Sequence, residues 1–355
     1  MLTVTDPIIT PPAAAVQWEV LPRLDESDIS DVSLLVERVA ENDGIRPLSE
    51  HVMLHLRYGG DAGVRHILAR LNGALIGYAH LDATDEISGP SAELAVTPSA
   101  RRTGVGRQLV AHLLREAPDG RLRIWAHGDH GGAGPLASVM GMRRSRTLWQ
   151  MRRPLAAALP DPVWPDGVTL RSFLPGIDDD EFLALNRRAF VDLPDQAGLT
   201  PDDLQARMCE PWFDPEGFLI AVEGNAGNQR IVGFHWTKVH GADAHRHGHV
   251  ERSGEHGHEH GEHSEHSEHS EHSAHDHHAH GHGHEPMGEV YVVGVAPDRH
   301  GLGLGRALTL AGLQHLRSLG LPDAMLYVDA SNTTAIRLYT DLGFSRWDVD
   351  VEFST

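Results

Sequence analysis

The chain has 355 residues, 40% of them hydrophobic and 23% charged, which is typical of a folded protein long enough for two domains. Its formal net charge of -20 disfavours binding to nucleic acid or to an anionic membrane surface. No run of about 20 apolar residues could span a bilayer, and the first residues lack the basic and apolar pattern of a secretory leader. Cys209 is the single cysteine, so no internal disulfide can form and we expect a cytoplasmic protein.

The first half of the chain predicts a mixed α/β domain. Apolar residues recur at helical spacing over 28–40, and two alternating strands follow in VRHILARL and ALIGYAHL. A third strand then leads through a glycine-rich turn into a helix over 106–115 and a further strand. The second half repeats this order, with helices over 179–190 and 305–318 and strands in GFLIAVEG and RIVGFHWTKV.

Two segments of the chain are related to each other. LAVTPSARRTGVGR (Leu94–Arg107) aligns with VGVAPDRHGLGLGR (Val293–Arg306) at a constant separation in the sequence. Further upstream, Gly77 aligns with Gly233, and the separation of this pair is shorter. The difference between the two separations is nearly the length of a histidine-rich segment. This pattern indicates a tandem duplication with an insertion between two adjacent strands. We therefore expect two tandem α/β domains of mixed sheet, 1–153 and 168–355, joined by a proline-rich linker over 154–167, with an insertion over 241–285.

The inserted segment has an unusual composition. Of the 27 histidines, 17 lie between His240 and His284, among acidic residues and almost no apolar ones, so the segment cannot form a core. It is either a disordered, metal-indifferent loop or a loop whose imidazoles bind Zn²⁺ or Ni²⁺ incidentally. We expect no catalytic metal. Cys209 has no evident catalytic partner and is interpreted as a packed or incidental thiol.

In both halves, a Gly-x-Gly turn joins a strand directly to an amphipathic helix. Such a turn presents backbone N–H groups at the positive end of the helix, which favours binding of a phosphate or pyrophosphate. Neither copy has the Gly-Lys-Ser/Thr ending of a P-loop or the setting of a dinucleotide-binding fingerprint.

These turns, RRTGVG (101–106) and HGLGLG (300–305), are similar to the acetyl-CoA motif of the GNAT acetyltransferase superfamily. The resemblance implies a GNAT fold in each half and acetyl-CoA as co-substrate. It also implies coenzyme contacts along both loops and at a later Asn-Thr-Thr segment. The residues are Leu94, Ala95, Val96, Arg102, Thr103, Gly104, Val105, Gly106 and Arg107; Val293, Gly294, Val295, His300, Gly301, Leu302, Gly303, Leu304, Gly305 and Arg306; and Asn332, Thr333, Thr334, Ala335, Ile336 and Arg337.

Aminolysis of a thioester needs a neutral amine, a polarised carbonyl and a proton for the leaving thiolate. Glu289 and Tyr291 are two residues apart in a predicted strand, so Glu289 is the candidate base, acting directly or through water. Backbone N–H groups near Val293–Val295, at a bulge such as GNAT strands carry, are candidates for polarising the carbonyl. Tyr339 is the candidate acid for the thiolate. At the position of Tyr339 the first half has Ala137, so we expect that half to bind acetyl-CoA without catalysing transfer.

Longer stretches spread over nearly the whole chain resemble the mycothiol synthase family: IWAHG, QMRRPL, WFDPEG, GFHWTKVH, GEVYVVGV and LYVDASNTTAIRLYTDLGF. This resemblance implies acetylation of the cysteinyl amine of cysteinyl-glucosaminyl-inositol, the last step in making mycothiol. It also implies acceptor contacts from Glu50, Asp195, Lys238, Glu289 and Tyr327. The alternatives are a tandem acetyltransferase for another small amine or peptide N-terminus, and a non-enzymatic protein that binds acetyl-CoA or metal.

Overall fold

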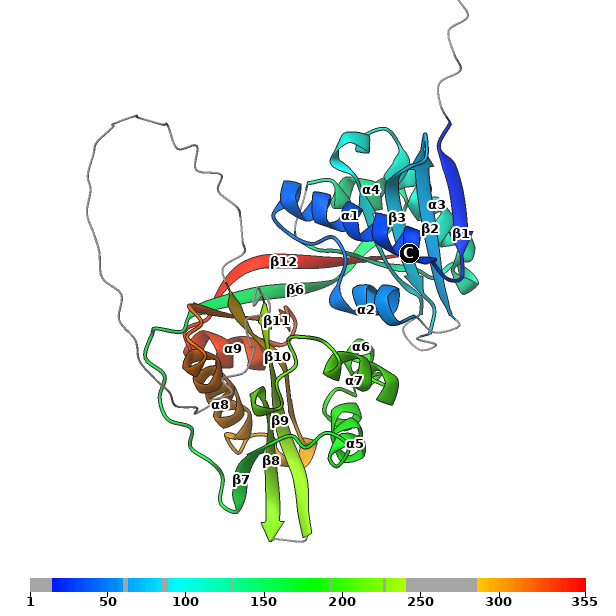
Figure 1. Cartoon of the computed structure of the whole chain (residues 1–355). Coiled ribbons are helices and arrows are strands. Elements are labelled where there is room, and N and C mark those ends of the chain that lie inside the picture. The colour runs from blue at the N-terminus through cyan, green and yellow to red at the C-terminus, as the bar shows by residue number, and fades with distance from the viewer. Residues whose placement is uncertain are drawn as a thin grey trace, which may run out of the picture.

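A computed structural model of the chain describes residues 15–59, 63–84, 89–128, 131–191, 193–225, 228–240 and 286–355. The described strands form one sheet in the order β1-β2-β3-β4-β5-β12-β6-β11-β10-β9-β8-β7 (Figure 1). The elements of the first half are β1 (Gln17–Leu21), α1 (Glu26–Asp43), α2 (Glu50–Tyr58), β2 (Val64–Leu71), β3 (Ala74–Asp82), β4 (Ser91–Val96), α3 (Val105–Glu116), β5 (Arg123–Ala126), α4 (Ala133–Val139) and β6 (Arg143–Pro154). Those of the second half are β7 (Val168–Ser172), α5 (Asp179–Ala189), α6 (Pro194–Ala197), α7 (Pro201–Met208), β8 (Phe218–Asn225), β9 (Asn228–His240), β10 (Met287–Val295), α8 (Leu304–Ser318), β11 (Asp323–Asp329), α9 (Thr333–Asp341) and β12 (Ser345–Ser354). Short 3-10 turns occupy Pro98–Ala100, Pro118–Gly120, Pro215–Gly217 and Pro297–Arg299.

The mixed α/β architecture confirms the fold expected from the sequence, and the duplication is visible in the order of the elements. Within the first half, strand side chains alternate between two cores. Ile67 and Ala79 pack in the core that contains α3, whereas Leu68 and Tyr78 pack in the core that contains α1 and α2. Helices therefore cover both faces of this part of the sheet. In the second half, α5 packs on Phe234 and Trp236, while α8 packs in separate clusters.

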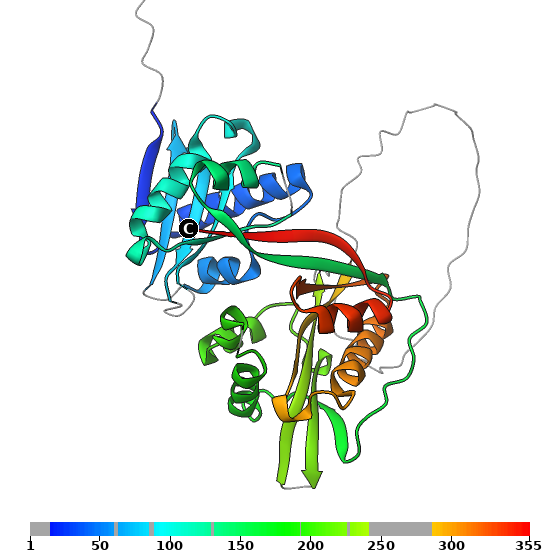
Figure 2. The same ribbon diagram turned by 180° about the vertical axis from the view of Figure 1, so that it is seen from behind.

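The two halves exchange their last strands, which the sequence did not indicate. β12, from the end of the chain, pairs antiparallel with β5 of the first half, and β6 of the first half pairs antiparallel with β11 of the second half. β6 and β12 also pair with each other, and both run from one half to the other (Figures 1 and 2). The sheet of each half is thus completed by a strand from the other.

Buried polar contacts hold β12 against the first half. His127, just after β5, lies 3.0 Å from Asp350 of β12 and 3.5 Å from Glu93 of β4. Burial lowers the pKa of His127, but the charge of Glu93 and the hydrogen bond to Asp350 outweigh it and raise that pKa to about 10. Arg123 of β5 adds an ion pair with Glu352 at 3.4 Å. These ion pairs and hydrogen bonds therefore hold β12 in place, in addition to its backbone hydrogen bonds with β5.

The insertion joins two adjacent strands, as predicted. β9 and β10 are antiparallel neighbours with His240 opposite Met287, just as β3 and β4 are neighbours in the first half. The histidine-rich segment 241–285 lies outside the described residues, so its predicted lack of structure and its metal binding stay predictions. Within the described ranges, no helix is both long and apolar enough to cross a bilayer.

Candidate active site

The two glycine-rich turns have the same backbone construction. Gly104 and Gly303 are the residues that precede α3 and α8, and their φ angles of 98° and 83° favour glycine over residues with a Cβ. Arg102 and Gly301 occupy equivalent positions and both have positive φ, 63° and 78°, so the second copy avoids the strain that Arg102 accepts. Each turn leaves the first N–H groups of its helix without intrahelical partners, as an anion site requires.

Arg101 and His300 occupy equivalent positions at the start of the two loops, and both make the same contact with the preceding strand. The Arg101 Nε donates to the Val96 carbonyl, and the His300 Nε2 lies within hydrogen-bond distance of the equivalent Val295 carbonyl, both at 3.2 Å. Arg101 also pairs with Asp43 of α1. Each side chain ties its loop back to the preceding strand, so the His300 ring supports the loop and leaves any anion contact to the backbone.

The strand before each loop separates from its parallel neighbour. β4 pairs with β5 only from Ser91 to Glu93, and β10 pairs with β11 only from Met287 to Glu289. Beyond these residues, β4 and β10 have no ladder partner on that side within the described part of the chain, so an inserted ligand can accept hydrogen bonds from the backbone. β10 also carries a register shift at Tyr291, between Val290 and Val292, two residues before the Val293–Val295 stretch where we expected the bulge.

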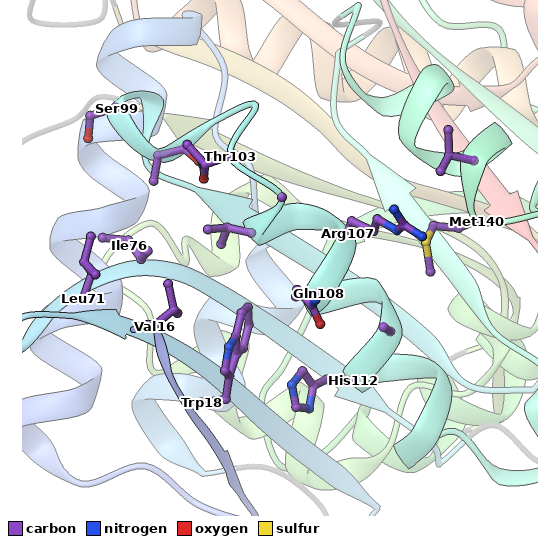
Figure 3. A pocket seen from close by; sticks show the side chains of 15 residues that line it. Val16, Trp18, Leu71, Ile76, Ser99, Thr103, Arg107, Gln108, His112 and Met140 are labelled. Atoms are coloured by element: carbon purple, nitrogen blue, oxygen red, sulfur yellow. Dashed lines mark hydrogen bonds between the residues drawn. The ribbon is translucent and has the colours of Figure 1, made fainter. Parts of the chain in front are cut away.

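A cavity of about 480 Å³ lies where β4 and β5 separate. Ala137 of α4 lines this cavity together with predicted coenzyme residues from the end of β4 and from the loop. These residues are Leu94, Ala95, Val96, Arg102, Gly104, Gly106 and Arg107. A larger hollow of about 1160 Å³ lies on the other side of α3, where Trp18 stacks on His112 with ring centroids 4.9 Å apart (Figure 3). This hollow shares Gly104 and Arg107 with the smaller cavity but lacks Leu94–Val96, so the smaller cavity fits the expected coenzyme position better.

Glu289 is buried on β10, and His240 at the end of β9 holds it. The His240 Nε2 lies 2.6 Å from the Glu289 carboxylate. Burial raises the pKa of Glu289, but the hydrogen bond and charge of His240 and the charge of Lys238 outweigh it, so the pKa lies below its ordinary value. The carboxylate is therefore ionised at neutral pH, and the half-buried His240 connects it towards solvent.

Lys238 joins the two halves of the molecule. Its ammonium forms an ion pair with Glu50, the first residue of α2 in the first half. The same nitrogen lies over the Trp212 ring at 4.7 Å and the Tyr291 ring at 5.4 Å, and all but 8% of Lys238 is buried. The structure thus brings together Glu50, Lys238 and Glu289, three residues for which acceptor contacts were expected, although Glu50 and Lys238 are far apart in the chain.

Aromatic and basic residues that were not among the predicted site residues surround this cluster. Arg207 of α7 donates from Nε to the Tyr291 hydroxyl at 2.9 Å, and Trp212 covers the Lys238 ammonium. Trp212 and His240 both stand in quoted motifs, WFDPEG and GFHWTKVH, so their presence there was the available signal. Nothing in the spacing of Arg207 indicated its contact with Tyr291.

The remaining candidates lie on neighbouring elements. Tyr327 of β11 accepts a hydrogen bond from Gln150 of the exchanged β6 at 2.8 Å. Tyr339 of α9 packs against Phe344 at a ring distance of 5.8 Å, and burial raises its pKa to about 12, so the phenol is neutral and able to donate a proton at pH 7. The Asn332–Arg337 segment forms the start of α9, where Asn332 accepts from the Ala335 N–H at 3.0 Å. Asp195 lies on α6, and its side chain is outside the described set.

Comparison with known proteins agrees with this construction. The model of the acetyltransferase (GNAT) family matches residues 35–134 and 266–344. The chain is 46% identical to a mycothiol acetyltransferase of Streptosporangium roseum, over 93% of this chain and 97% of that protein. It is 48% identical to a mycothiol acetyltransferase of Salinispora arenicola, over 93% and 94%. The chain belongs to the mycothiol acetyltransferases of the GNAT family. It is therefore an acyltransferase of the class that uses acetyl-CoA.

Solved structures support the same fold. A GCN5-related N-acetyltransferase from Sphaerobacter thermophilus superposes with a TM-score of 0.60 at 24% identity, covering 95% of each chain. A tandem GNAT protein from the clavulanic acid biosynthesis pathway superposes with a TM-score of 0.62 at 16% identity, covering 96% of this chain and 98% of that one. At these identities, the likeness establishes the tandem fold alone.

Proposed function

We propose that this mycothiol acetyltransferase moves the acetyl group of acetyl-CoA to the cysteinyl amine of cysteinyl-glucosaminyl-inositol, with chemistry confined to its second half. The observation that carries the proposal is the cluster of the buried Glu289 and Lys238 with the partly buried Glu50, which lies beside the gap between β10 and β11. A carboxylate base and a cationic anchor for a polar acceptor lie at the place where a GNAT coenzyme arm would enter.

The acid and base roles follow from the charge states. Glu289 is ionised and accepts the proton of the substrate ammonium, and the adjacent His240 passes that proton towards solvent. A lowered pKa makes the carboxylate a weak final acceptor for an amine proton, which is why a neighbouring imidazole matters. The resulting neutral amine is the nucleophile.

The bonds then change as follows. The amine nitrogen attacks the thioester carbon, and β10 N–H groups that have no ladder partner stabilise the oxyanion. The C–S bond breaks as the tetrahedral intermediate collapses, and the nitrogen loses its second proton to Glu289, which has passed the first one to His240. Tyr339 gives its proton to the coenzyme A thiolate and regains one from solvent. The products are an amide and free coenzyme A, and no metal ion is required.

The two halves have different roles in this proposal. The first half has the cavity and loop for a coenzyme but presents Ala137 where the second half has Tyr339, so we assign it binding without transfer. It also contributes Glu50 to the acceptor site. Cys209 is free, which supports a cytoplasmic location.

The test uses the purified full chain with acetyl-CoA and the cysteinyl pseudo-disaccharide. Free coenzyme A is separated by chromatography, and the acetylated acceptor is identified by mass. Glucosaminyl-inositol without the cysteinyl group and the acceptor with a blocked amine are the matched controls. We expect release only with the free cysteinyl amine. Equal release without it would refute the proposal, and release with an unrelated amine at the same kcat/KM would refute the assigned acceptor.

A further inference from the structure

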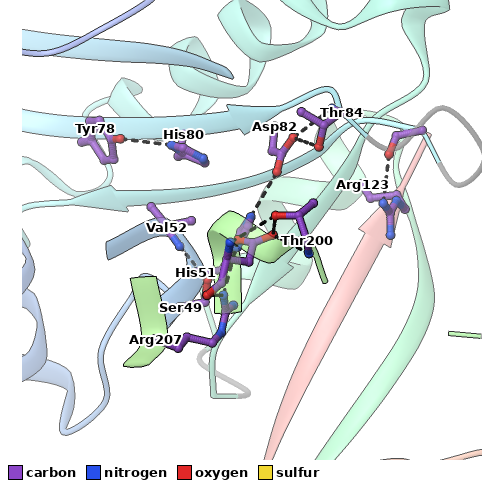
Figure 4. A network of polar contacts seen from close by, with 12 residues as sticks. Ser49, His51, Val52, Tyr78, His80, Asp82, Thr84, Arg123, Thr200 and Arg207 are labelled. Carbon is purple, nitrogen blue, oxygen red and sulfur yellow. Dashed lines mark hydrogen bonds and ion pairs between the residues drawn. The ribbon is translucent and has the colours of Figure 1, made fainter. Parts of the chain in front are cut away.

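A second polar cluster lies outside the acetyl-transfer site, between α2 and β3. His51 and His55 are one helical turn apart on α2, and Asp82 ends β3. One ligand atom from each of the three lies within 4.8 Å of the others. The His51 Nε2 and the Asp82 Oδ2 are 3.2 Å apart (Figure 4). The rings of His51 and His55 are 4.0 Å apart.

The Asp82 carboxylate is oriented as a ligand would be. Its Oδ1 accepts from both the backbone N–H and the hydroxyl of Thr84, at 2.9 and 2.7 Å. The other oxygen, Oδ2, faces His51. Such support of one carboxylate oxygen, with the second left for a cation, is the usual outer shell of a protein metal site.

His80 supplies an independent observation. It is 1% exposed, its ring lies 5.6 Å from that of His55, and its Nε2 is buried with no hydrogen-bond partner among the described residues. An unpartnered buried nitrogen costs free energy unless something binds it. On the far side, the His80 Nδ1 contacts the Tyr78 hydroxyl, which bonds His66 at 2.8 Å.

We propose that His51, His55 and Asp82 bind one divalent zinc-type ion and leave its fourth position open. Imidazole nitrogens with a single carboxylate oxygen select zinc over magnesium or calcium, which prefer all-oxygen shells. Tetrahedral zinc with bonds of about 2.0–2.1 Å places its ligand atoms about 3.3 Å apart, close to the 3.2 Å between His51 and Asp82. The ion ties α2 to β3, and α2 begins at Glu50, the partner of Lys238.

The experiment uses zinc alone with the full chain. Because the histidine-rich segment is present in every variant, zinc binding is read as the difference between chains in a titration against a chromophoric chelator. His51→Gln and Asp82→Asn remove one donor each, and Asp82→Asn keeps the shape of the side chain. His112→Gln, in the first half but stacked on Trp18, is the matched control. Crystals grown with equimolar zinc locate the ion by anomalous scattering at the zinc edge.

We expect an anomalous peak between His51 and Asp82. Both site variants should bind one zinc ion fewer, or bind that ion at least about 10-fold more weakly, while the control matches the unmodified chain. Zinc should also raise the Tm of the unmodified chain by more than that of His51→Gln. Zinc density only at other places, or equal titrations for all four chains, would overturn the proposal. Because zinc binding is measured without acetyl-CoA or acceptor, neither outcome depends on whether the proposed acetyl transfer is correct.

Discussion

Gly305→Asp should strongly weaken acetyl transfer without harming the fold. Gly305 lies in the first turn of α8, and a Cβ built there lies 3.7 Å from Val295, an ordinary contact. A negative charge in the first turn of a helix stabilises it by about 0.3–1 kcal/mol. The Tm of Gly305→Asp should therefore equal or slightly exceed that of the unmodified protein.

Coenzyme binding should change in the opposite direction. A carboxylate about 5 Å from a phosphate charge costs about 3 kcal/mol at an effective dielectric constant of about 20. That energy corresponds to about 200-fold weaker binding, so kcat/KM for acetyl-CoA should fall by about that factor. Gly305→Ala adds the same Cβ without the charge and should stay within about threefold.

Gly106→Asp is the matched lesion in the first half. Its Cβ lies 3.4 Å from Leu136, so the fold accommodates it with a small shift. It should remove one coenzyme site in a calorimetric titration and lower the steady-state rate by less than about threefold. Steady-state acetylation and thermal melts of the three variants decide the matter. If Gly106→Asp is inactive and Gly305→Asp retains activity, the assignment of catalysis to the second half is wrong.

Four further predictions follow from the site and the sheet. Glu289→Gln should lower kcat by about 10²–10⁴-fold with an unchanged Kd for acetyl-CoA, and unchanged turnover from pH 6 to 9 would exclude Glu289 as the base. His240→Gln should raise the pKa of Glu289, because the hydrogen bond and charge of His240 lower that pKa. The acid limb of the pH profile of kcat/KM should therefore move to higher pH. An unchanged limb would show that His240 does not control the ionisation of Glu289 during turnover. Glu93 and Asp350 raise the pKa of His127 to about 10, so the contribution of His127 to stability is complete below about pH 6.5 and is lost as the pH rises towards 10. The free energy of unfolding measured in urea should fall over this pH range. In His127→Gln the free energy of unfolding should depend less on pH. Replacing 241–286 by Asn-Gly should keep the rate within about threefold, because His240 and Met287 are already paired, whereas loss of folded protein would show that the segment is structural.

Local patterns predicted the helices and the insertion well. The amphipathic run over 28–40 became α1 from Glu26 to Asp43, because Asp25 caps its start and Gly44, with φ 75°, ends it. The expected helix over 305–318 became α8 from Leu304 to Ser318. The two related segments located the insertion, since a duplicated strand order shows where extra chain has entered.

The strand exchange was beyond the reach of such patterns. β6 and β12 occupy equivalent places in the repeat, and each pairs with the other as well as with a strand of the opposite half. Swapping two equivalent strands leaves the alternation of buried and exposed residues unchanged, so the sequence favours neither arrangement. The contact of Asp350 with His127 is specific to the exchanged form, but it joins residues too distant in the chain for spacing to reveal.

Contacts that depend on packing between elements were equally hidden. His51 and His55 have the spacing of two ligands on one helix face, and this signal was present in the sequence. The third member, Asp82, becomes their neighbour only because α2 packs on the sheet beside the end of β3. In the same way, Glu50 meets Lys238 only because the two halves are held in one orientation.

The exchange gives a physical reason for keeping a first half that has Ala137 in place of the proposed acid Tyr339. Without β12, the edge of β5 would be unpaired, and without β6, the edge of β11 would be unpaired, so neither half alone has a complete sheet. The joined sheet also fixes α2 relative to β9, which places Glu50 against the buried Lys238. A lysine buried beside two aromatic rings needs a carboxylate partner, because an unpaired buried charge is costly. The first half thus supplies both a strand and a counter-charge to the site at which we propose that the second half catalyses acetyl transfer.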